Sequence, residues 1–423
     1  MLHTETKSPP SFTEIAAAIR EKMAEKPAQV FVPGKTKIPL QVPSFGPDEV
    51  IEALDSMMTG WVTMGKKVKT FEEAWAKYIG VKHAIMTNSG SSANLLLLSA
   101  YRFQPDHEII TPALTWATTV FPIAQVGALP VLVDVGRDSY NIDPTAIERA
   151  ITSRTRAIFL VHLLGNPCEM DAIVDIAQRR GLVLLEDACE AHGAEYKGQK
   201  VGSFGGAATF SFFFSHHIST IEGGMVVTDN DVIANRVRAQ RAFGWIRDIP
   251  TKDIVARRSP TIDPRFLFDL PGFNFRPTEM QGAFGIHQVP KLEGFIAQRR
   301  ESHAYWNKEL SCYSKHLEIP WEKPRTRHVS FAYPIQVKQG APFTKQALQD
   351  YLESKGVETR PIEAGNMAVQ PAMRHIKHRV EDIPNAEHID RNAFFIGNHQ
   401  AIGQQEREAV VSYVHDFMKE RGL

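Results

Sequence analysis

The sequence predicts an α/β fold, with a large, mixed but mostly parallel sheet in one domain and a smaller α/β domain after it. One reason is that short apolar runs alternate along the chain with polar or helical segments, which is typical of βαβ units. A second is that several runs are apolar at every position, as expected for strands covered on both faces of a sheet. The runs expected to form the strands of the large sheet are 107–112, 130–135, 157–164, 182–185, 210–214 and 225–228.

The chain has 423 residues, which is enough for two domains with sizeable cores. We expect an N-terminal extension over 1–35, a large domain over 36–285 and a smaller domain over 286–423. The extension is polar and interrupted by prolines, and it carries one amphipathic helix over 12–23 that follows a capping serine, Ser11.

The helices of the large domain begin with 47–58, where a proline and two acidic residues suit the first turn. The other helices expected there are 71–78, 95–101, 144–151 and 170–179. A long helix from about Ala283, made irregular by Pro290, leads into the smaller domain. That domain is expected to hold a strand over 329–337 and helices over 344–355 and 406–419.

Composition narrows the classes of function. Lys+Arg and Asp+Glu both number 48, so no basic field indicates a nucleic-acid or membrane partner. Cys168, Cys189 and Cys312 lie far apart without a CxxC pair, which excludes a disulfide framework and a zinc ribbon, and no metal is expected. Residues 1–25 have no continuous apolar core, so neither a signal peptide nor a membrane span is expected, and the predicted location is cytoplasmic.

The stretch over 209–228, TFSFFFSHHISTIEGGMVVT, is the centre of the predicted site. Two apolar strands enclose a polar turn that carries His216 and His217. Ligands of α/β folds bind at strand ends, so a histidine there is a candidate for chemistry. A histidine beside apolar residues is, however, more often structural, and the spacing alone leaves both interpretations open.

A second candidate is the small-residue turn over 87–94, TNSGSSAN, which precedes a helical run. Such a turn presents backbone N–H groups and hydroxyls to an anion, as a phosphate site requires. Serine and asparagine also cap helices of every kind, so the motif alone is weak evidence. Gly90 and Ser91 are the residues we expect to meet a phosphate.

The stretch around His216 resembles the cofactor strand of the DegT/DnrJ/EryC1/StrS sugar aminotransferases, Ser-Phe-x-x-x-Lys-Asn followed by Gly-Gly. Ser211 and Phe212 match, whereas the lysine that holds pyridoxal phosphate in that family falls on His216. A small branch of the family carries this change and dehydrates nucleotide sugars at C3. The resemblance spans roughly 36–420 and implies fold type I of the pyridoxal-phosphate enzymes, as in aspartate aminotransferase.

The resemblance also assigns the contacts of the cofactor. Trp116 falls where the family stacks an aromatic ring on the pyridine, although a core tryptophan is the alternative. Asp187 would keep the pyridine nitrogen protonated, and Glu190 stands where the dehydratase branch has glutamate near the ring hydroxyl. Cys189 between them is expected to pack rather than react. The cofactor residues implied are Gly90, Ser91, Trp116, Asp187, Glu190, Ser211 and Asn274.

Substrate contacts are implied by three further stretches. The loop over 60–63 resembles one that borders the sugar site. The stretch over 272–276 resembles a Gly-Tyr-Asn-x-Arg element that reaches across a dimer interface, with Phe273 in place of tyrosine, so a homodimer with shared active sites is implied. Arg247 suits a substrate phosphate, with a solvated surface arginine as the alternative. The substrate residues implied are Gly60, Trp61, Val62, Thr63, Arg247, Arg276 and Glu358.

The activity that the resemblance implies is C3 dehydration of a nucleotide-linked 4-keto-6-deoxyhexose, with GDP-4-keto-6-deoxy-D-mannose preferred. His216 would act as the base on pyridoxamine phosphate, and His217 as a positioning group. Ammonia is released, and L-glutamate regenerates pyridoxamine phosphate from pyridoxal phosphate. Deoxysugars of this kind belong to lipopolysaccharide O-antigens.

Three alternatives to this activity differ from it in the residues that they require. A related dehydrase uses an iron–sulfur cluster and a reductase partner, but 244–269 contains no cysteine, so neither is expected. An aminotransferase would need a displaced lysine, and Lys197 and Lys200 are expected on another element. A catalytically inactive relative that binds a nucleotide sugar is disfavoured because the cofactor residues are intact.

Overall fold

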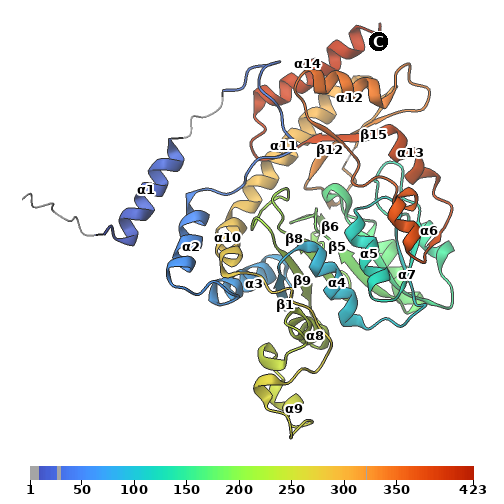
Figure 1. Cartoon of the computed structure of the whole chain (residues 1–423). Coiled ribbons are helices and arrows are strands. Elements are labelled where there is room, and N and C mark those ends of the chain that lie inside the picture. Colours follow the sequence, from blue (N-terminus) through green and yellow to red (C-terminus); the bar gives the residue numbers. More distant parts are fainter. Residues whose placement is uncertain (1–8, 26–29, 321) are drawn as a thin grey trace, which may run out of the picture.

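The computed structural model describes residues 9–25, 30–320 and 322–423, and an eight-stranded sheet forms the centre of its large domain (Figure 1). In spatial order the strands are β1 (His83–Thr87), β9 (Gly224–Thr228), β8 (Ala207–Ser211), β5 (Val183–Asp187), β4 (Thr155–Val161), β2 (Glu108–Pro112), β3 (Leu129–Val133) and β14 (Arg379–Val380). Only β9 runs antiparallel to its neighbours, and the other strand pairs are parallel. The predicted mixed, mostly parallel sheet is therefore confirmed.

Helices cover both faces of this sheet, because alternate residues of each strand point to opposite sides. In β4, Phe159 packs in one apolar cluster and its neighbours Ile158 and Leu160 pack in another. The first cluster includes residues of α4 (Gly90–Tyr101), α5 (Ala117–Gln125) and α8 (Asp231–Arg241). The second includes residues of α6 (Pro144–Ala150) and α7 (Met170–Arg180), and α3 (Lys66–Ile79) extends the cover beside β8 and β9.

The smaller domain is built on an antiparallel sheet with the strand order β10 (Leu317–Glu318), β12 (Ala332–Val337), β15 (Ala393–Gly397) and β13 (Thr359–Pro361). Trp306, Leu348 and Phe417 join its core from α11 (Leu292–Leu310), α12 (Lys345–Ser354) and α14 (Gln404–Lys419). The predicted irregularity at Pro290 is present, because α10 (Glu279–Gln288) gives way to a 3₁₀ turn, Val289–Lys291, before α11 begins.

The remaining elements are short or peripheral. They are α2 (Pro47–Met58), α9 (Lys252–Ala256), α13 (Pro384–Asn392) and a three-stranded sheet of β11 (Thr326–Arg327), β6 (Glu195–Tyr196) and β7 (Gln199–Lys200). Within the described ranges, no helix has the length and apolar character needed to cross a membrane.

The N-terminal segment contains the predicted helix, α1 (Phe12–Ala24), capped by Ser11, whose Oγ accepts a hydrogen bond from the Glu14 N–H at 3.3 Å. Phe31 and Ile38 pack in the core of the smaller domain, and Ile38 pairs with Val357. The chain therefore touches the C-terminal domain before it enters the large one.

One strand ends earlier than the sequence indicates. We expected 210–214 to be a strand, but β8 ends at Ser211, where its pairing with Gly224 of β9 ends. The next residue, Phe212, bonds across a loop instead, its N–H to the Gly223 carbonyl and its carbonyl to the Thr220 N–H, both at 2.9 Å. This loop carries His216.

Candidate active site

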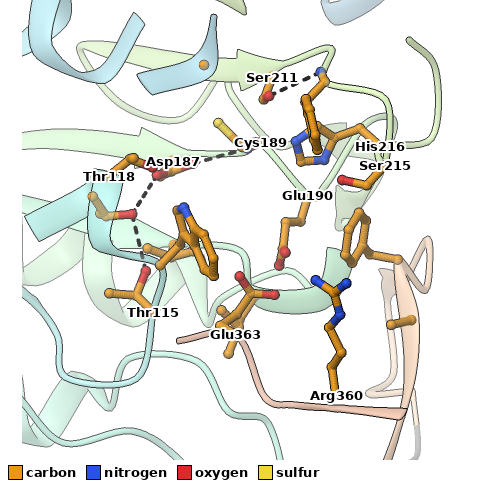
Figure 2. A pocket seen from close by; sticks show the side chains of 18 of the residues that line it. Thr115, Thr118, Asp187, Cys189, Glu190, Ser211, Ser215, His216, Arg360 and Glu363 are labelled. Carbon is orange, nitrogen blue, oxygen red and sulfur yellow. Dashed lines mark hydrogen bonds between the residues drawn. The ribbon is translucent and has the colours of Figure 1, made fainter. Parts of the chain in front are cut away.

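A cavity of about 550 Å³ lies at the carboxyl ends of the parallel strands, where the two domains meet (Figure 2). Val161, Asp187 and Ser211, the last residues of β4, β5 and β8, line it from the large domain. The smaller domain contributes Arg360 and Phe395. The other lining residues are Leu40, Gln41, Ser89, Gly90, Ser91, Thr115, Trp116, Thr118, Thr119, Leu163, Cys189, Glu190, Phe213, Ser215, His216, Glu222, Phe331, Ala332, Glu358, Pro361 and Glu363.

Asp187 is buried at one end of the cavity and is fixed by three donors. Its Oδ2 accepts from Asn94 Nδ2 at 2.9 Å and from Thr119 Oγ1 at 2.8 Å, and its Oδ1 accepts from the Cys189 N–H at 3.2 Å. Asn94 is itself oriented by Thr209, whose hydroxyl donates to Asn94 Oδ1 at 2.5 Å. Asp187 thus holds one orientation, which suits a carboxylate that meets a single ligand atom.

The N-terminus of α4 forms another wall. Ser89 caps this helix, and its Oγ accepts from the Ser92 N–H at 3.1 Å. Gly90 approaches β8 so closely that a Cβ added to it would lie 2.5 Å from the Ser211 Cβ. The first turn of the helix therefore presents free N–H groups beside two serine hydroxyls, Ser91 and Ser211, as an anion site requires.

Trp116 lies at the start of α5 and is 53% exposed, in contact with the cavity rather than the core. Figure 2 shows Asp187, Glu190, His216 and Glu363 around one space, which Trp116 also lines. The structure thus excludes the alternative of a core tryptophan, and it leaves the ring free to stack on a planar ligand.

His216 lines the cavity from the loop after β8. Its Nδ1 is buried without a hydrogen-bond partner among the described residues, which leaves Nε2 as the nitrogen that can meet a ligand. Burial, with the charge of nearby Arg299, lowers the pKa of His216 to about 3. The ring is therefore neutral at neutral pH, as a base must be before it accepts a proton.

His217 has a different position. It is fully buried, it is not among the lining residues, and its Nε2 lies 3.1 Å from the Val329 carbonyl, to which it donates. Burial also lowers its pKa well below the usual value. This arrangement fixes the loop that carries His216 against the smaller domain, as a positioning group would.

Carboxyl groups outnumber cations in the cavity. Glu190 is nearly buried, and its Oε2 accepts from the Leu164 N–H at 2.8 Å. Figure 2 shows the carboxyl groups of Glu190 and Glu363 pointing toward one another. Arg360 is the only arginine or lysine among the described residues that line the cavity, and its guanidinium extends into it.

The other predicted residues lie outside this cavity. Together with Phe243 and Trp245 they form a set of loop residues that we call the exposed loop face. Its members are Gly60, Trp61, Val62, Thr63, Phe243, Trp245, Arg247, Asn274 and Arg276. Arg276 lies over the Phe243 ring at 4.9 Å and donates to Asn274 Oδ1 at 3.1 Å. Arg247 lies over the Trp245 ring at 4.2 Å. Within one chain, the two arginines contact their neighbours on this face, and none of its residues lines the cavity.

The exposed loop face nevertheless borders the cavity rim. Thr63 pairs with Thr278, the cap of α10. Gln281 of that helix donates to the Glu222 carbonyl, and Glu222 lines the cavity. Of the predicted substrate residues, only Glu358 reaches the cavity directly.

Several lining residues were missed by sequence reasoning. Thr119, three residues after Trp116, lines the cavity, and Asn94 of the small-residue turn does not, but nothing in the sequence indicated that both would bond Asp187. Arg360 follows Glu358, an implied substrate residue, by two positions, and this was the available signal. Glu363 carried no signal, because it comes from the other domain and faces Glu190 only in three dimensions.

The residues present fit pyridoxal phosphate. A dianionic phosphate has free N–H groups and hydroxyls at the start of α4, where the close approach of Gly90 to Ser211 leaves no room for a side chain. Asp187 lies where it can meet a ring nitrogen, and the exposed indole of Trp116 supplies a stacking surface. None of the described lining residues is a lysine, so the cofactor would be held without a covalent bond.

Comparison with known proteins agrees with this geometry. Residues 44–415 match the DegT/DnrJ/EryC1/StrS aminotransferase family. The chain is 39% identical over 349 residues to GDP-4-keto-6-deoxy-D-mannose 3-dehydratase of Yersinia pseudotuberculosis, covering 80% of this chain and 88% of that protein.

Two solved structures of GDP-4-keto-6-deoxymannose-3-dehydratase, each 35% identical to the chain, share its fold. A mutant with bound GDP-perosamine has a TM-score of 0.85, covering 89% of this chain and 100% of that one. The enzyme with a trapped PLP-glutamate geminal diamine has a TM-score of 0.83, covering 89% of this chain and 99% of that one. The chain therefore belongs to the DegT/DnrJ/EryC1/StrS family of pyridoxal-phosphate-dependent enzymes.

Proposed function

We propose that this enzyme removes the C3 hydroxyl of a nucleotide-linked 4-keto-6-deoxyhexose, with GDP-4-keto-6-deoxy-D-mannose as the preferred substrate. The observation that carries the proposal is the cavity itself, which has His216 beside the predicted cofactor site and no lysine among its described lining residues. Transamination in this family requires that lysine. Lys197, in the turn after β6, pairs with Asp171, and Lys200 on β7 pairs with Glu195. Neither lysine lines the cavity.

When bound, pyridoxamine phosphate supplies an amine that joins the C4 ketone and a ring that accepts electrons. Asp187 keeps the ring nitrogen protonated, because its fixed carboxylate favours a positive charge beside it. Trp116 holds the ring by stacking. Ser211 and the first turn of α4 hold the phosphate.

His216 moves the proton. With cofactor and sugar bound, its Nε2 would take a proton from the cofactor carbon that bears the amine and would give it to the C3 hydroxyl, which would leave as water when the C3–O bond breaks. The pKa of about 3 belongs to the cavity before ligands enter. The negative charges of a cofactor phosphate and a nucleotide diphosphate favour the charged imidazolium, so ligand binding raises the basicity of His216.

Arg360 is the group best placed to attract an anionic substrate. It is the lone cation among the described lining residues, and a guanidinium binds phosphate or carboxylate with two parallel hydrogen bonds. The same position serves the nucleotide sugar and then L-glutamate, which regenerates pyridoxamine phosphate. The preference for GDP is supported by the relative that has GDP-perosamine bound. The role of L-glutamate is supported by the relative with a trapped PLP-glutamate geminal diamine.

The exposed loop face supports a homodimer with shared sites. A second copy of the chain would bring Asn274 and Arg276 to a cavity that lacks enough cations for a diphosphate. Mixing tests this, because a His216→Asn chain and an Arg276→Ala chain would form dimers in which one of two sites is intact. Equal mixing would then restore about a quarter of the wild-type rate. Mass spectrometry of tagged chains monitors whether the dimers exchange subunits. If they exchange and no activity is recovered, shared active sites are refuted.

The direct test of the activity is anaerobic incubation with pyridoxal phosphate, L-glutamate and GDP-4-keto-6-deoxy-D-mannose, followed by mass spectrometry of the sugar. We expect the sugar to lose one oxygen with release of ammonia, and we expect His216→Lys to abolish this. A sugar that gains an amine would instead establish an aminotransferase. Tight binding of every 4-keto-6-deoxy nucleotide sugar without change would establish an inactive relative.

A further inference from the structure

Two carboxyl groups face each other in the cavity wall, that of Glu190 buried and that of Glu363 half-buried. Glu190 follows β5, and Glu363 follows β13 in the smaller domain. Figure 2 shows the two side chains pointing toward one another. Two carboxylates that face each other at close range repel one another, which favours a proton held between the members of the pair.

The backbone holds this pair with unusual conformations. Glu363 has a φ of 49°, in the left-handed region that residues other than glycine seldom adopt. Leu164, whose N–H donates to Glu190 Oε2, has a φ of 50°. Two strained residues from two domains therefore place one carboxyl group against the other, which is typical of a functional site.

The surroundings are predominantly acidic. Burial and the charge of Glu363 raise the pKa of Glu190 well above its usual value, and burial also raises the pKa of Glu363. The hydrogen bond between them stabilises the charged form of Glu363. The other titratable or charged groups that line the cavity are Asp187, Cys189, His216, Glu222, Glu358 and Arg360.

We propose that Glu363 is a positioning residue, whose carboxylate accepts a hydrogen bond from the carboxylic acid of Glu190 and so keeps Glu190 protonated in the working enzyme. The pair then carries one negative charge and one proton. Glu190 presents an O–H donor, rather than a second charge, to an oxygen that enters the cavity beside it. This role concerns the cofactor site and is independent of whether the enzyme dehydrates or aminates its sugar.

If Glu190 is protonated, its side chain is chemically similar to that of glutamine. A neutral carboxylic acid donates one hydrogen bond and accepts others, as a glutamine amide does. Glu190→Gln should therefore preserve the contact that Glu190 makes with the cofactor, while Glu363→Gln should disturb it by releasing the proton of Glu190. Of these two Glu→Gln substitutions, the one at Glu363, which is not expected to contact the cofactor, should therefore have the larger effect on the cofactor contact.

Infrared difference spectroscopy tests the proton directly, without substrate. At neutral pH the wild-type enzyme should show the carbonyl stretch of a buried carboxylic acid, and Glu190→Gln should lose it. In Glu363→Gln the band should disappear at a pH about 1–3 pH units lower than in the wild type, because the neighbouring negative charge has been removed. Glu358→Gln is the matched control, since its Oε2 accepts from the Leu40 N–H, and it should leave the band unchanged. A band absent from the wild type, or unmoved in Glu363→Gln, would overturn the proposal.

The visible absorption of bound pyridoxal phosphate gives a second readout. Glu363→Gln should shift the pH dependence of this spectrum in the wild-type background and have no effect in the Glu190→Gln background. An equal shift in both backgrounds would mean that Glu363 acts on the cofactor directly, contrary to the proposal. Should Glu363→Gln not fold, Glu363→Asn replaces it, because asparagine tolerates a positive φ. The infrared band and the cofactor spectrum are measured without sugar, so they test this proposal even if the protein does not dehydrate GDP-4-keto-6-deoxy-D-mannose.

Discussion

The cavity and the exposed loop face were both expected to bind ligands, yet one chain completes only the first. In the cavity, Asp187 accepts three hydrogen bonds from residues of its own chain. On the exposed loop face, Arg247 and Arg276 lie over aromatic rings, and Trp61 is 60% exposed. The difference teaches that one chain builds the cavity from its own contacts, whereas the exposed loop face would join the site only in the proposed homodimer.

The largest effect is expected from His216 in the cavity. His216→Asn removes the base, so turnover should fall by about 10²–10⁴-fold. Pyridoxal phosphate should still bind, because Asp187, Ser211 and the start of α4 are unchanged. Stopped-flow assays and a cofactor titration measure the two quantities separately. If cofactor binding were lost together with turnover, His216 would be a structural residue. The cavity and the exposed loop face would then no longer differ in the way described here.

The next effect concerns the helix start at Gly90. A Cβ at this position would lie 2.5 Å from the Ser211 Cβ, so Gly90→Ala must displace β8 or α4, at a cost of about 1–3 kcal/mol. The affinity for pyridoxal phosphate should fall because the N–H groups move. Gly294, which has open space around its Cα, is the matched control, and Gly294→Ala should leave cofactor affinity unchanged. Equal affinities in the two variants would argue against a phosphate site at α4.

Two tryptophans of similar exposure compare the regions directly. Trp116 in the cavity is 53% exposed, and Trp61 on the exposed loop face is 60% exposed. Trp116→Ala should weaken cofactor binding by about 2–10-fold, the value of an aromatic stack. Trp61→Ala should leave cofactor binding unchanged and raise the KM for the sugar. If Trp61→Ala weakened cofactor binding as much as Trp116→Ala, the proposed division would fail.

The smallest effect at neutral pH is expected from the buried histidines behind the cavity. Burial lowers the pKa of His192 and His217 well below the usual value, and that of His216 and His328 to about 3. The unfolded chain takes up protons below about pH 6.5 that the folded chain does not. The free energy of unfolding should therefore fall as the pH drops from about 6.5 toward 3.

Urea denaturation at a series of pH values measures this effect. His217→Asn should make the acid-side loss of stability less steep, because one such group is removed. His375→Asn is the control, since His375 lies at the surface. A variant of His217 with the same pH dependence as the wild type would contradict the cause assigned here.

Much of the fold could be predicted from the sequence, because its signals are local. The alternation of apolar runs and helices gave the strands of the large sheet, and Pro290 marked the break before α11. The end of β8 was predicted wrongly because the apolar run continues past the strand, and its residues have different environments there. Phe212 is buried in the core, whereas Phe213 is 43% exposed and lines the cavity.

The site was predictable to the extent that a motif carried it. Gly90, Asp187, Ser211 and His216 lie in contiguous motifs, and the structure brings all four to one cavity. Contacts that form between distant segments leave no such pattern. Glu363 meets Glu190 across the domain boundary, and no spacing in the sequence encodes that meeting.

The absence of a lysine from the described cavity lining has a consequence for the cell. A cofactor that is not covalently attached leaves and returns like any other ligand, so the fraction of active enzyme follows the free concentration of vitamin B6 phosphates. Binding of this kind stabilises the folded state by RT ln(1 + [L]/Kd). Melting temperature should thus rise with added pyridoxal phosphate, and sugar output would then depend on cofactor supply.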